Sequence, residues 1–179
     1  MFEPFKPFIT SEFQVKFATE MWERQGAFAL RQEVFCREQG LFPGDDRDET
    51  DDVAITIVAL SMLGVAADEV VGTVRIHQPE PGVWWGSRLA VASDYRRVGM
   101  LGVALIRLAV CSAHAKGCHL FLAHVQEQNV PLFRHLNWVS LEEVELHGMI
   151  HHRMQADLEA YPPFTAVETG FRALARRAA

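Results

Sequence analysis

The sequence predicts a mixed α/β (α+β) fold with a central, mostly antiparallel sheet of six to seven strands flanked by helices. Short apolar or alternating segments, typical of strands, lie between segments whose apolar residues recur every three or four positions, as in amphipathic helices. The clearest example is the stretch 88–115. There a short apolar strand passes through two arginines and two glycines into a helix with Leu101, Leu105 and Leu108 on one face.

The remaining elements are predicted in order along a single domain, residues 1–179, which begins with an irregular arm over 1–12 and ends with a C-terminal extension over 159–179. Glycine, proline and charged residues separate the periodic segments and set their limits. We expect a strand near 13–17, a helix over about 21–39, a hairpin of 53–63 and 70–77, a strand over 84–91, the helix over 101–115, a strand at 120–123, a helix after Asn129, a hairpin of 139–146 and 149–158, and a C-terminal helix over 164–179.

Composition limits the classes of function. The net charge of -6 gives no general attraction to nucleic acid or to an anionic membrane, so we expect neither as a partner. Cys36, Cys111 and Cys118 form no CxxC pair and suit buried thiols in a reducing compartment. The first residues lack the features of a signal peptide, and no apolar run reaches about 18 residues. We therefore expect a soluble cytoplasmic protein, either a monomer or a homodimer.

The turn that precedes the helix over 101–115 has the features of an anion site. A strand that enters a helix through glycines leaves main-chain N–H groups unpaired at the helix start, where the helix dipole favours negative charge. Two arginines flank the turn. The stretch lacks both the GxxxxGK[ST] of a nucleotide triphosphate loop and the GxGxxG of a dinucleotide fold, which excludes those two types of phosphate site.

Residues 96–102, RRVGMLG, resemble the pyrophosphate loop of the GNAT superfamily of N-acetyltransferases, whose pattern is Arg or Gln, two residues, Gly, one residue, and Gly or Ala. Arg96 and Gly99 fall in register, whereas Leu101 stands where the family prefers Gly or Ala. Residues 87–91 resemble the family's fourth strand, and residues 125–138 resemble its later "VQ..N..a..FY.k.GF" segment.

Further matches, within a resemblance that covers roughly residues 13–158, point to the ElaA-like branch of this superfamily. Residues 30–40 resemble its "R..VF..EQ" segment, which borders the acceptor pocket and occurs more distantly in acyl-homoserine-lactone synthases. Residues 148–154 resemble the "dG.PH..M" ending of the branch. The "CREQGLF" stretch at 36–42 is also similar to acetyltransferases encoded near nitrilases.

The resemblance implies an acyl-CoA-dependent N-acyltransferase that moves an acetyl group directly from acetyl-CoA to the amine of a small molecule. Loop amides and arginines would hold the pyrophosphate of acetyl-CoA, and the strand at 89–91, diverging from the strand at 120–124, would pair with its pantetheine. The implied cofactor-binding residues are Leu89, Ala90, Val91, Arg96, Arg97, Val98, Gly99, Met100, Leu101, Gly102, Val103, Asn129 and Phe133.

The chemistry needs a neutral amine and a proton for the leaving thiolate. Many relatives use a Tyr for the second step, but Phe133 stands at that position and has no proton to give. We take Glu38 and His77 as the first catalytic candidates, ahead of His124 and His151. We take Glu38, Trp85 and Ser87 as the acceptor-binding residues. Alternatively, Glu38 is a solvated residue at a helix end, and the histidines are hydrogen-bonded core residues.

An acidic segment, residues 45–52, carries six carboxylates and lacks the spacing of an EF-hand, so we assign no metal. We expect it to be a solvated loop that attracts a cationic amine substrate. Two alternatives to an N-acetyltransferase remain open: an enzyme like the acyl-homoserine-lactone synthases, and a non-catalytic module that senses acyl-CoA.

Overall fold

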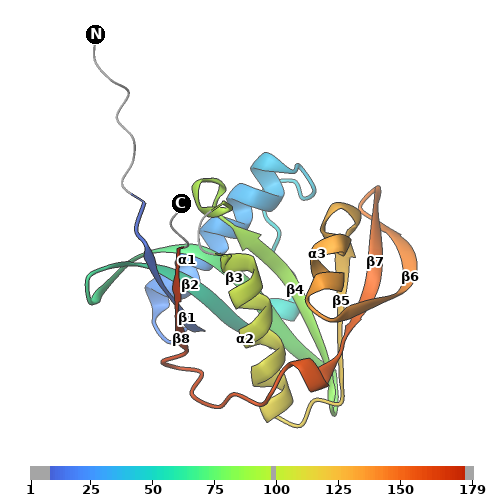
Figure 1. Ribbon diagram of the computed structural model, residues 1–179. Coiled ribbons are helices and arrows are strands. Elements are labelled where there is room, and N and C mark those ends of the chain that lie inside the picture. The colour runs from blue at the N-terminus through green and yellow to red at the C-terminus, as the bar shows by residue number, and fades with distance from the viewer. Residues whose placement is uncertain (1–8, 98–99, 176–179) are drawn as a thin grey trace.

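The computed structural model describes residues 9–97 and 100–175 and contains a single eight-stranded sheet in the order β6-β7-β5-β4-β3-β2-β1-β8 (Figure 1). All neighbouring strands are antiparallel except β4 and β5. The strands are β1 (Glu12–Phe17), β2 (Ile55–Leu63), β3 (Ala66–Glu80), β4 (Val83–Val91), β5 (Leu120–Gln126), β6 (Trp138–Leu146), β7 (Met149–Ala156) and β8 (Phe171–Leu174), and the α-helices are α1 (Met21–Arg31), α2 (Leu101–Ala115) and α3 (Val130–His135). The predicted fold class is confirmed, with β8 as an additional strand.

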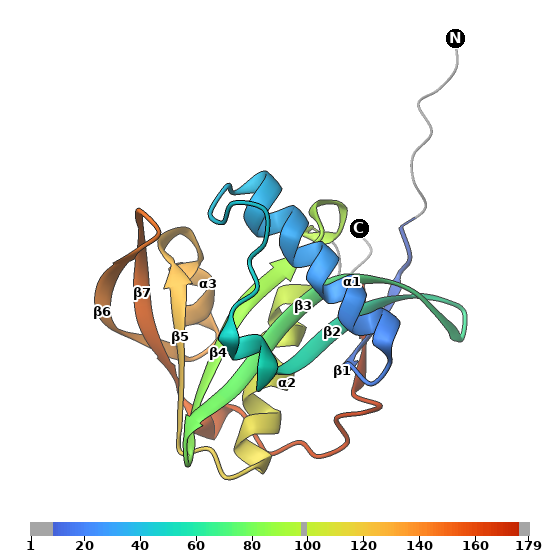
Figure 2. The ribbon, with the colours of Figure 1, turned by 180° about the vertical axis from the view of Figure 1, so that it is seen from behind.

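Helices cover both faces of the sheet, α2 on one and α1 on the other (Figure 2). The sequence of β2 explains why this is possible, because it is apolar without alternation. Ile57 and Ala59 pack in the core that contains α2, whereas Val58 and Leu60 pack in the core that contains α1. Successive side chains of a strand point to opposite faces, so a strand covered on both faces must be apolar throughout.

The first helix continues from α1 into a π-helix, η1 (Gln32–Glu38). The predicted extent is therefore correct, and the helix ends before Gly40, which has φ +63°. In the wider turn, the N–H of Gln39 donates to the carbonyl of Val34, five residues earlier, at 3.0 Å. Turns of this kind are rare and occur frequently at functional sites.

Two features concern the expected cytoplasmic location: the burial of the cysteines and the length of the helices. Cys111 and Cys118 are buried free thiols and Cys36 is partly exposed. Burial raises the pKa of the Cys111 and Cys118 thiols. None of the helices in the described residues is long and apolar enough to cross a membrane. A cytoplasmic location stays a prediction.

The C-terminal helix predicted over 164–179 is wrong for the described part of that range. The chain after β7 has no α-helix there, and Phe171–Leu174 forms β8, which pairs antiparallel with β1. The Ala- and Arg-rich composition favours a helix locally. The open edge of β1 offers main-chain hydrogen-bond partners instead, and pairing with it outweighs that local preference.

β4 and β5 pair over their first halves only. Val83–Gly86 pair with 120–123 of β5, and beyond Gly86 the two strands diverge, which confirms the predicted splay (Figure 1). A β-bulge bends β4 at this point: residues two positions apart on β3, Thr73 and Arg75, lie opposite Ala90 and Ser87, which are three positions apart. The divergence leaves a gap in the middle of the sheet.

Gly170, just before β8, allows a test of this docking. Its φ is +60°, and a Cβ there would overlap the carbonyl oxygen of Val15 in β1. Gly148 also has a positive φ, +73°, but no atom lies within 4 Å of its Cβ position. Gly148→Ala should cost only the conformational strain of about 1 kcal/mol, and Gly170→Ala at least twice as much. Urea unfolding measures both; equal losses would mean that β8 is not packed this closely on β1.

Candidate active site

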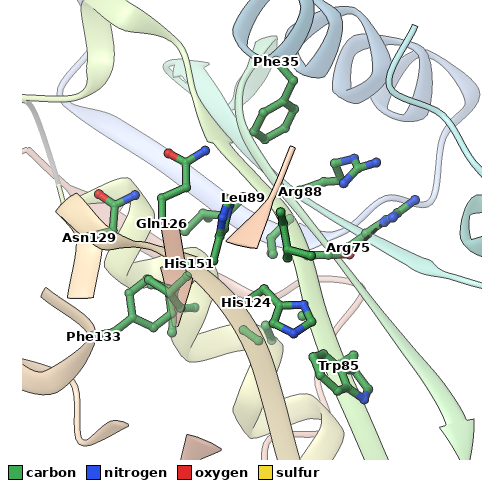
Figure 3. Close-up of a pocket in the computed structure, with 18 of the residues that line it drawn as sticks. Phe35, Arg75, Trp85, Arg88, Leu89, His124, Gln126, Asn129, Phe133 and His151 are labelled. Carbon is green, nitrogen blue, oxygen red and sulfur yellow. Dashed lines mark hydrogen bonds between the residues drawn. The ribbon is translucent and has the colours of Figure 1, made fainter. Parts of the chain in front are cut away.

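The divergence of β4 and β5 opens a cleft of about 320 Å³. This volume is at the small end of the range for ligand pockets, about 300–1,000 Å³. Side chains from the two diverging strands, from β3, from η1 and from the segment around α3 converge on it (Figure 3). Ile106 and Val110 of α2 and Phe121 of β5, all buried, make part of its wall apolar.

The wall formed by β4 has an open main-chain edge. Past Gly86 no strand of the described residues pairs with the edge that faces β5. An extended ligand with amide groups can therefore pair with this edge as an added strand does. Arg88, in the bulge, has φ +55°, a conformation that few residues other than glycine adopt. Such local strain is concentrated at ligand sites.

The start of α2 is uncapped. The first helical bond runs from the N–H of Ala104 to the carbonyl of Met100, and no side chain of the described residues caps the preceding amides. A Cβ on Gly102 would meet no atom of the described residues within 4 Å, so the helix start is open on this side. Unpaired N–H groups and the dipole of a 15-residue helix together form a site for an anion.

Arg96 and Arg97, both exposed, precede this helix start and add positive charge. Arg96 donates from Nε to the carbonyl of Val91 at 2.9 Å, which keeps the turn close to the end of β4. Val98 and Gly99, predicted as loop ligands, lie outside the described residues.

The polar side chains of the cleft include imidazoles with lowered pKa values. His77 of β3 has a buried Nδ1 without a partner among the described residues. Burial, and then the charge of Arg75, lower the pKa of His77. The ring of His124 lies 4.9 Å from that of Trp85, and burial followed by His151 lowers the pKa of His124. Neutral imidazoles at pH 7 can accept a proton.

A family model described as the acetyltransferase (GNAT) family matches residues 15–138, more than half of the chain. The chain belongs to this family. The matched range contains the bulge of β4, the turn with Arg96 and Arg97, the whole of α2 and the cleft wall up to α3. A search of curated proteins finds no match.

Solved structures show the same GNAT fold. They include a protein from Lactobacillus plantarum provisionally named as an N-acetyltransferase (21% identity over 80% of this chain and 97% of that one, TM-score 0.71), ElaA from Escherichia coli (20% identity, 83% and 100%, TM-score 0.67), and BjaI, a CoA-dependent acyl-homoserine lactone synthase (18% identity, 83% and 86%, TM-score 0.64). At these identities the likeness shows the fold alone, and it includes ElaA, whose branch the sequence resembles.

In this GNAT cleft the structure brings together six of the predicted site residues: His77, Trp85, Ser87, Leu89, Asn129 and Phe133. Asn129 is the N-cap of α3 but makes no capping hydrogen bond. Phe133 is buried, with its ring 5.1 Å from that of Trp138. Other predicted cofactor residues lie outside the lining: Ala90 is buried against the α1 side, and Val91, Arg96, Arg97, Met100, Leu101, Gly102 and Val103 belong to the end of β4, the turn and the start of α2.

Glu38 lies outside the cleft lining, although Phe35 and Gln39 of the same helix end belong to it. Its Oε2 accepts a hydrogen bond from Nη2 of Arg96 at 2.7 Å. The structure therefore joins a predicted catalytic residue to a predicted pyrophosphate ligand. Its catalytic role stays a prediction.

The segment 39–42 runs across the cleft. Residues 30–40 were expected to border the acceptor pocket, whereas sequence reasoning missed Leu41 and Phe42, which also line the cleft. The Nε2 of Gln126 on β5 donates to Oε1 of Gln39 at 3.0 Å. Phe42 lies with its ring 4.7 Å from His147, in the turn between β6 and β7. These contacts join the α1 side of the molecule to the β5 side, and all four residues line the cleft.

The prediction that the acidic segment is a solvated loop is wrong for its central residues. Asp46 is only 1% exposed and accepts hydrogen bonds from Nε of both Arg31 and Arg88, at 2.8 and 2.9 Å. Asp51 forms a two-bond pair with Arg31, at 2.7 and 2.9 Å. Asp48 and Asp51 contact Arg75, and Asp48 also contacts Arg88. We call these three arginines and three aspartates the charge network.

The charge network has physical consequences. The pKa of the Asp51 carboxyl lies well below its usual range, because hydrogen bonds from Arg31 and Arg75 outweigh the effect of burial. The carboxylates of the charge network therefore bind arginine side chains. Among the described residues, no three His, Cys, Asp or Glu side chains are arranged to hold a metal ion.

Asp46→Asn should destabilise the protein by about 3 kcal/mol, because it removes the buried carboxylate that Arg31 and Arg88 share and leaves each of them with one remaining aspartate. Asp45→Asn is the matched control. Asp45 is half exposed, its ion pair within the described part of the chain is with the exposed Arg47, and its loss should change little. Urea unfolding at pH 7 compares the two. Similar midpoints would show that the network contributes no stability.

Proposed function

We propose that this GNAT protein transfers an acetyl group from acetyl-CoA directly to the amine of a small molecule. The observation that carries the proposal is the continuity of the site. The open edge of β4 in the cleft leads, through the turn at Arg96 and Arg97, to the uncapped start of α2. An extended amide chain that ends in a pyrophosphate matches both features in that order.

The ligands of related folds support a CoA-type donor. BjaI was solved with isopentyl-CoA, and another similar fold, the NatC complex, was solved with CoA. In the proposed complex the pantetheine pairs with Leu89–Val91, and the pyrophosphate lies on the amides of Leu101–Val103. Space above Gly102 and the charges of the two arginines favour the anion there.

The proposed chemistry is a direct transfer. The amine nitrogen attacks the thioester carbonyl carbon; the new C–N bond forms, the C–S bond breaks, and CoA leaves as a thiolate that takes up a proton. His77 is proposed to accept the proton of the amine, since its lowered pKa keeps the imidazole neutral at pH 7. Phe133 lines the cleft and supplies no proton, so thiolate protonation falls to water or to another group.

The role proposed for Glu38 follows from its contact. Because its carboxylate binds Arg96, we propose that it orients this arginine towards the pyrophosphate, in place of the base role that the sequence suggested.

Thiol release from acetyl-CoA in the presence of an amine panel tests the function as a whole. Acetyl-CoA binding without thiol release for any amine would indicate the non-catalytic module instead, and release only with longer acyl-CoA donors would favour the synthase-like alternative.

Gly102→Asp should lower acetyl-CoA affinity at least about 10-fold, because it sets a carboxylate in front of the α2 amides. An acid in the first turn of a helix is compatible with folding. Gly102→Asn has nearly the same size without the charge and should bind acetyl-CoA much more tightly than the Asp variant. Calorimetry measures both; equal affinities would place the pyrophosphate elsewhere.

His77→Gln should lower kcat about 100-fold with little change in acetyl-CoA affinity. In the wild type, kcat/KM per concentration of neutral amine should fall as the pH drops below 6.5, through the lowered pKa of His77, because protonation removes the proton acceptor. The variant should lose this acidic limb.

Glu38→Gln is the comparison for His77→Gln. If Glu38 orients Arg96, this variant should weaken acetyl-CoA binding and leave kcat largely unchanged. A large fall in kcat at unchanged affinity would instead support the base role for Glu38. An unchanged acidic limb in His77→Gln would remove His77 from the proton transfer.

A further inference from the structure

We infer that the amine acceptor carries a carboxylate close to its amino group, and that Arg88 binds this carboxylate. The acceptor class is thus an amino acid with an apolar side chain. This inference rests on the proposed function, whose acceptor it specifies.

The first observation is the charge of the cleft. Its lining contains two arginines, Arg75 and Arg88, and four histidines, but no Asp or Glu among the described residues; the histidines are His77, His124, His147 and His151. A polyamine or another purely cationic acceptor would find no counter-charge in this wall. An acceptor with an anionic group would find positively charged arginine side chains in this wall.

The second observation is that the acidic segment does not supply that counter-charge, because none of residues 45–52 lines the cleft. Its Asp46, Asp48 and Asp51 carboxylates are bound to arginines of the charge network, and none of the three lines the cleft. Three aspartates balance three arginines, so the network as a whole is neutral. The expectation that this segment attracts a cationic substrate therefore does not hold for these residues.

The third observation is that the two cleft arginines differ in whether all of their guanidinium nitrogens have hydrogen-bond partners. Arg75 is 4% exposed, and all three of its guanidinium nitrogens donate, to Ser87, Asp48 and Asp51. Arg88 is 16% exposed; its Nε and Nη2 contact Asp46 and Asp48, whereas its Nη1 has no partner among the described residues. Arg88 can accordingly donate to one more acceptor, and a carboxylate is the acceptor that a guanidinium binds best.

Two features hold Arg88 in place for this contact. Its guanidinium carbon lies 4.4 Å from the centre of the Phe42 ring, within cation–π range. Its main chain keeps the unusual φ of +55° in the bulge of β4. Strain retained at one residue of a cleft is consistent with a ligand contact there.

The position of Arg88 sets the size of the acceptor. It lies in β4 directly before Leu89, where the proposed pantetheine binding begins, so a carboxylate on Arg88 would be close to the thioester. Amino and carboxylate groups must then be separated by few bonds. Phe35, Phe42 and Trp85 also line the cleft and suit an apolar side chain.

The test compares three acceptors that differ at one group: phenylalanine, phenylalaninamide and phenethylamine, with spermidine as the cationic competitor. Rates are expressed per concentration of neutral amine, because the amines differ in pKa. We expect kcat/KM for phenylalanine at least about 10-fold above that of the other three, since only it can form the charged pair with Arg88. Equal or higher values for phenethylamine or spermidine would overturn the inference.

Arg88→Gln and Arg88→Lys assign the effect to this side chain. Arg88→Gln should raise KM for phenylalanine about 10-fold more than it raises KM for phenethylamine, because the ratio of the two KM values cancels any general change of the cleft. Arg88→Lys, which keeps the charge, should restore part of the preference and covers the case in which the Gln variant does not fold. A preference for phenylalanine that survives undiminished in folded Arg88→Gln, or in Arg88→Lys where the Gln variant does not fold, would overturn the role of Arg88.

Binding separates this inference from the proposed function. Calorimetry of the CoA-loaded protein with phenylalanine and phenethylamine needs no turnover. Tighter binding of phenylalanine without any thiol release would support the acceptor class while refuting catalysis. Thiol release with amines, but no preference for the carboxylate in either assay, would leave the transferase intact and overturn the inference, as would the absence of carboxylate-dependent binding altogether.

Discussion

The charge network is the constraint on which the active-site side of the molecule depends. Arg31, Arg75 and Arg88 come from α1, β3 and β4, and a buried or partly buried guanidinium without a counter-charge would be strongly destabilising. The acidic segment meets this need with carboxylates that the sequence places between α1 and β2. By doing so it ties a helix, a loop and two strands together on the face that carries η1. The bulge of β4 is held within this assembly, because Arg88 belongs to both.

From that bulge the rest of the site follows. A bent β4 cannot stay paired with β5, so the sheet opens where α2 begins, and the open edge and the uncapped helix start face the same ligand path. The π-helix η1 and the segment 39–42 then cross over the opening and contact β5 and the β6–β7 turn. The cleft thus carries arginine and histidine side chains on its acceptor side and is apolar beneath, although the chain as a whole is acidic. Net charge describes the solvated surface better than it describes this site.

Features encoded in neighbouring residues were predictable from the sequence, and features that depend on distant pairing were not. The helix from Leu101 follows from its own periodicity. β8 was missed because only the free edge of β1, more than 150 residues away, makes a strand preferable to a helix. The acidic segment looked solvated because its arginine partners are scattered over 31–88. Arginines inside apolar strands were the available signal that buried positive charges needed carboxylate partners. Glu38 was expected at the acceptor pocket from the resemblance of residues 30–40 to a family segment, and a resemblance does not fix the direction of a side chain. Each residue of a π-helix turns through a smaller angle than in an α-helix, which changes the face that its last residues present.

Amide hydrogen exchange, measured with and without CoA, tests the central claim that donor binding joins the β4 edge to the start of α2. CoA should slow exchange in two separate segments, Leu89–Val91 and Leu101–Val103, because ligand groups would occupy main-chain N–H groups that have no strand or cap as partner. The exposed hairpin tip around Gly64 should exchange at the same rate in both states. Protection of neither segment at saturating CoA, or protection confined to a region remote from the cleft, would contradict the account.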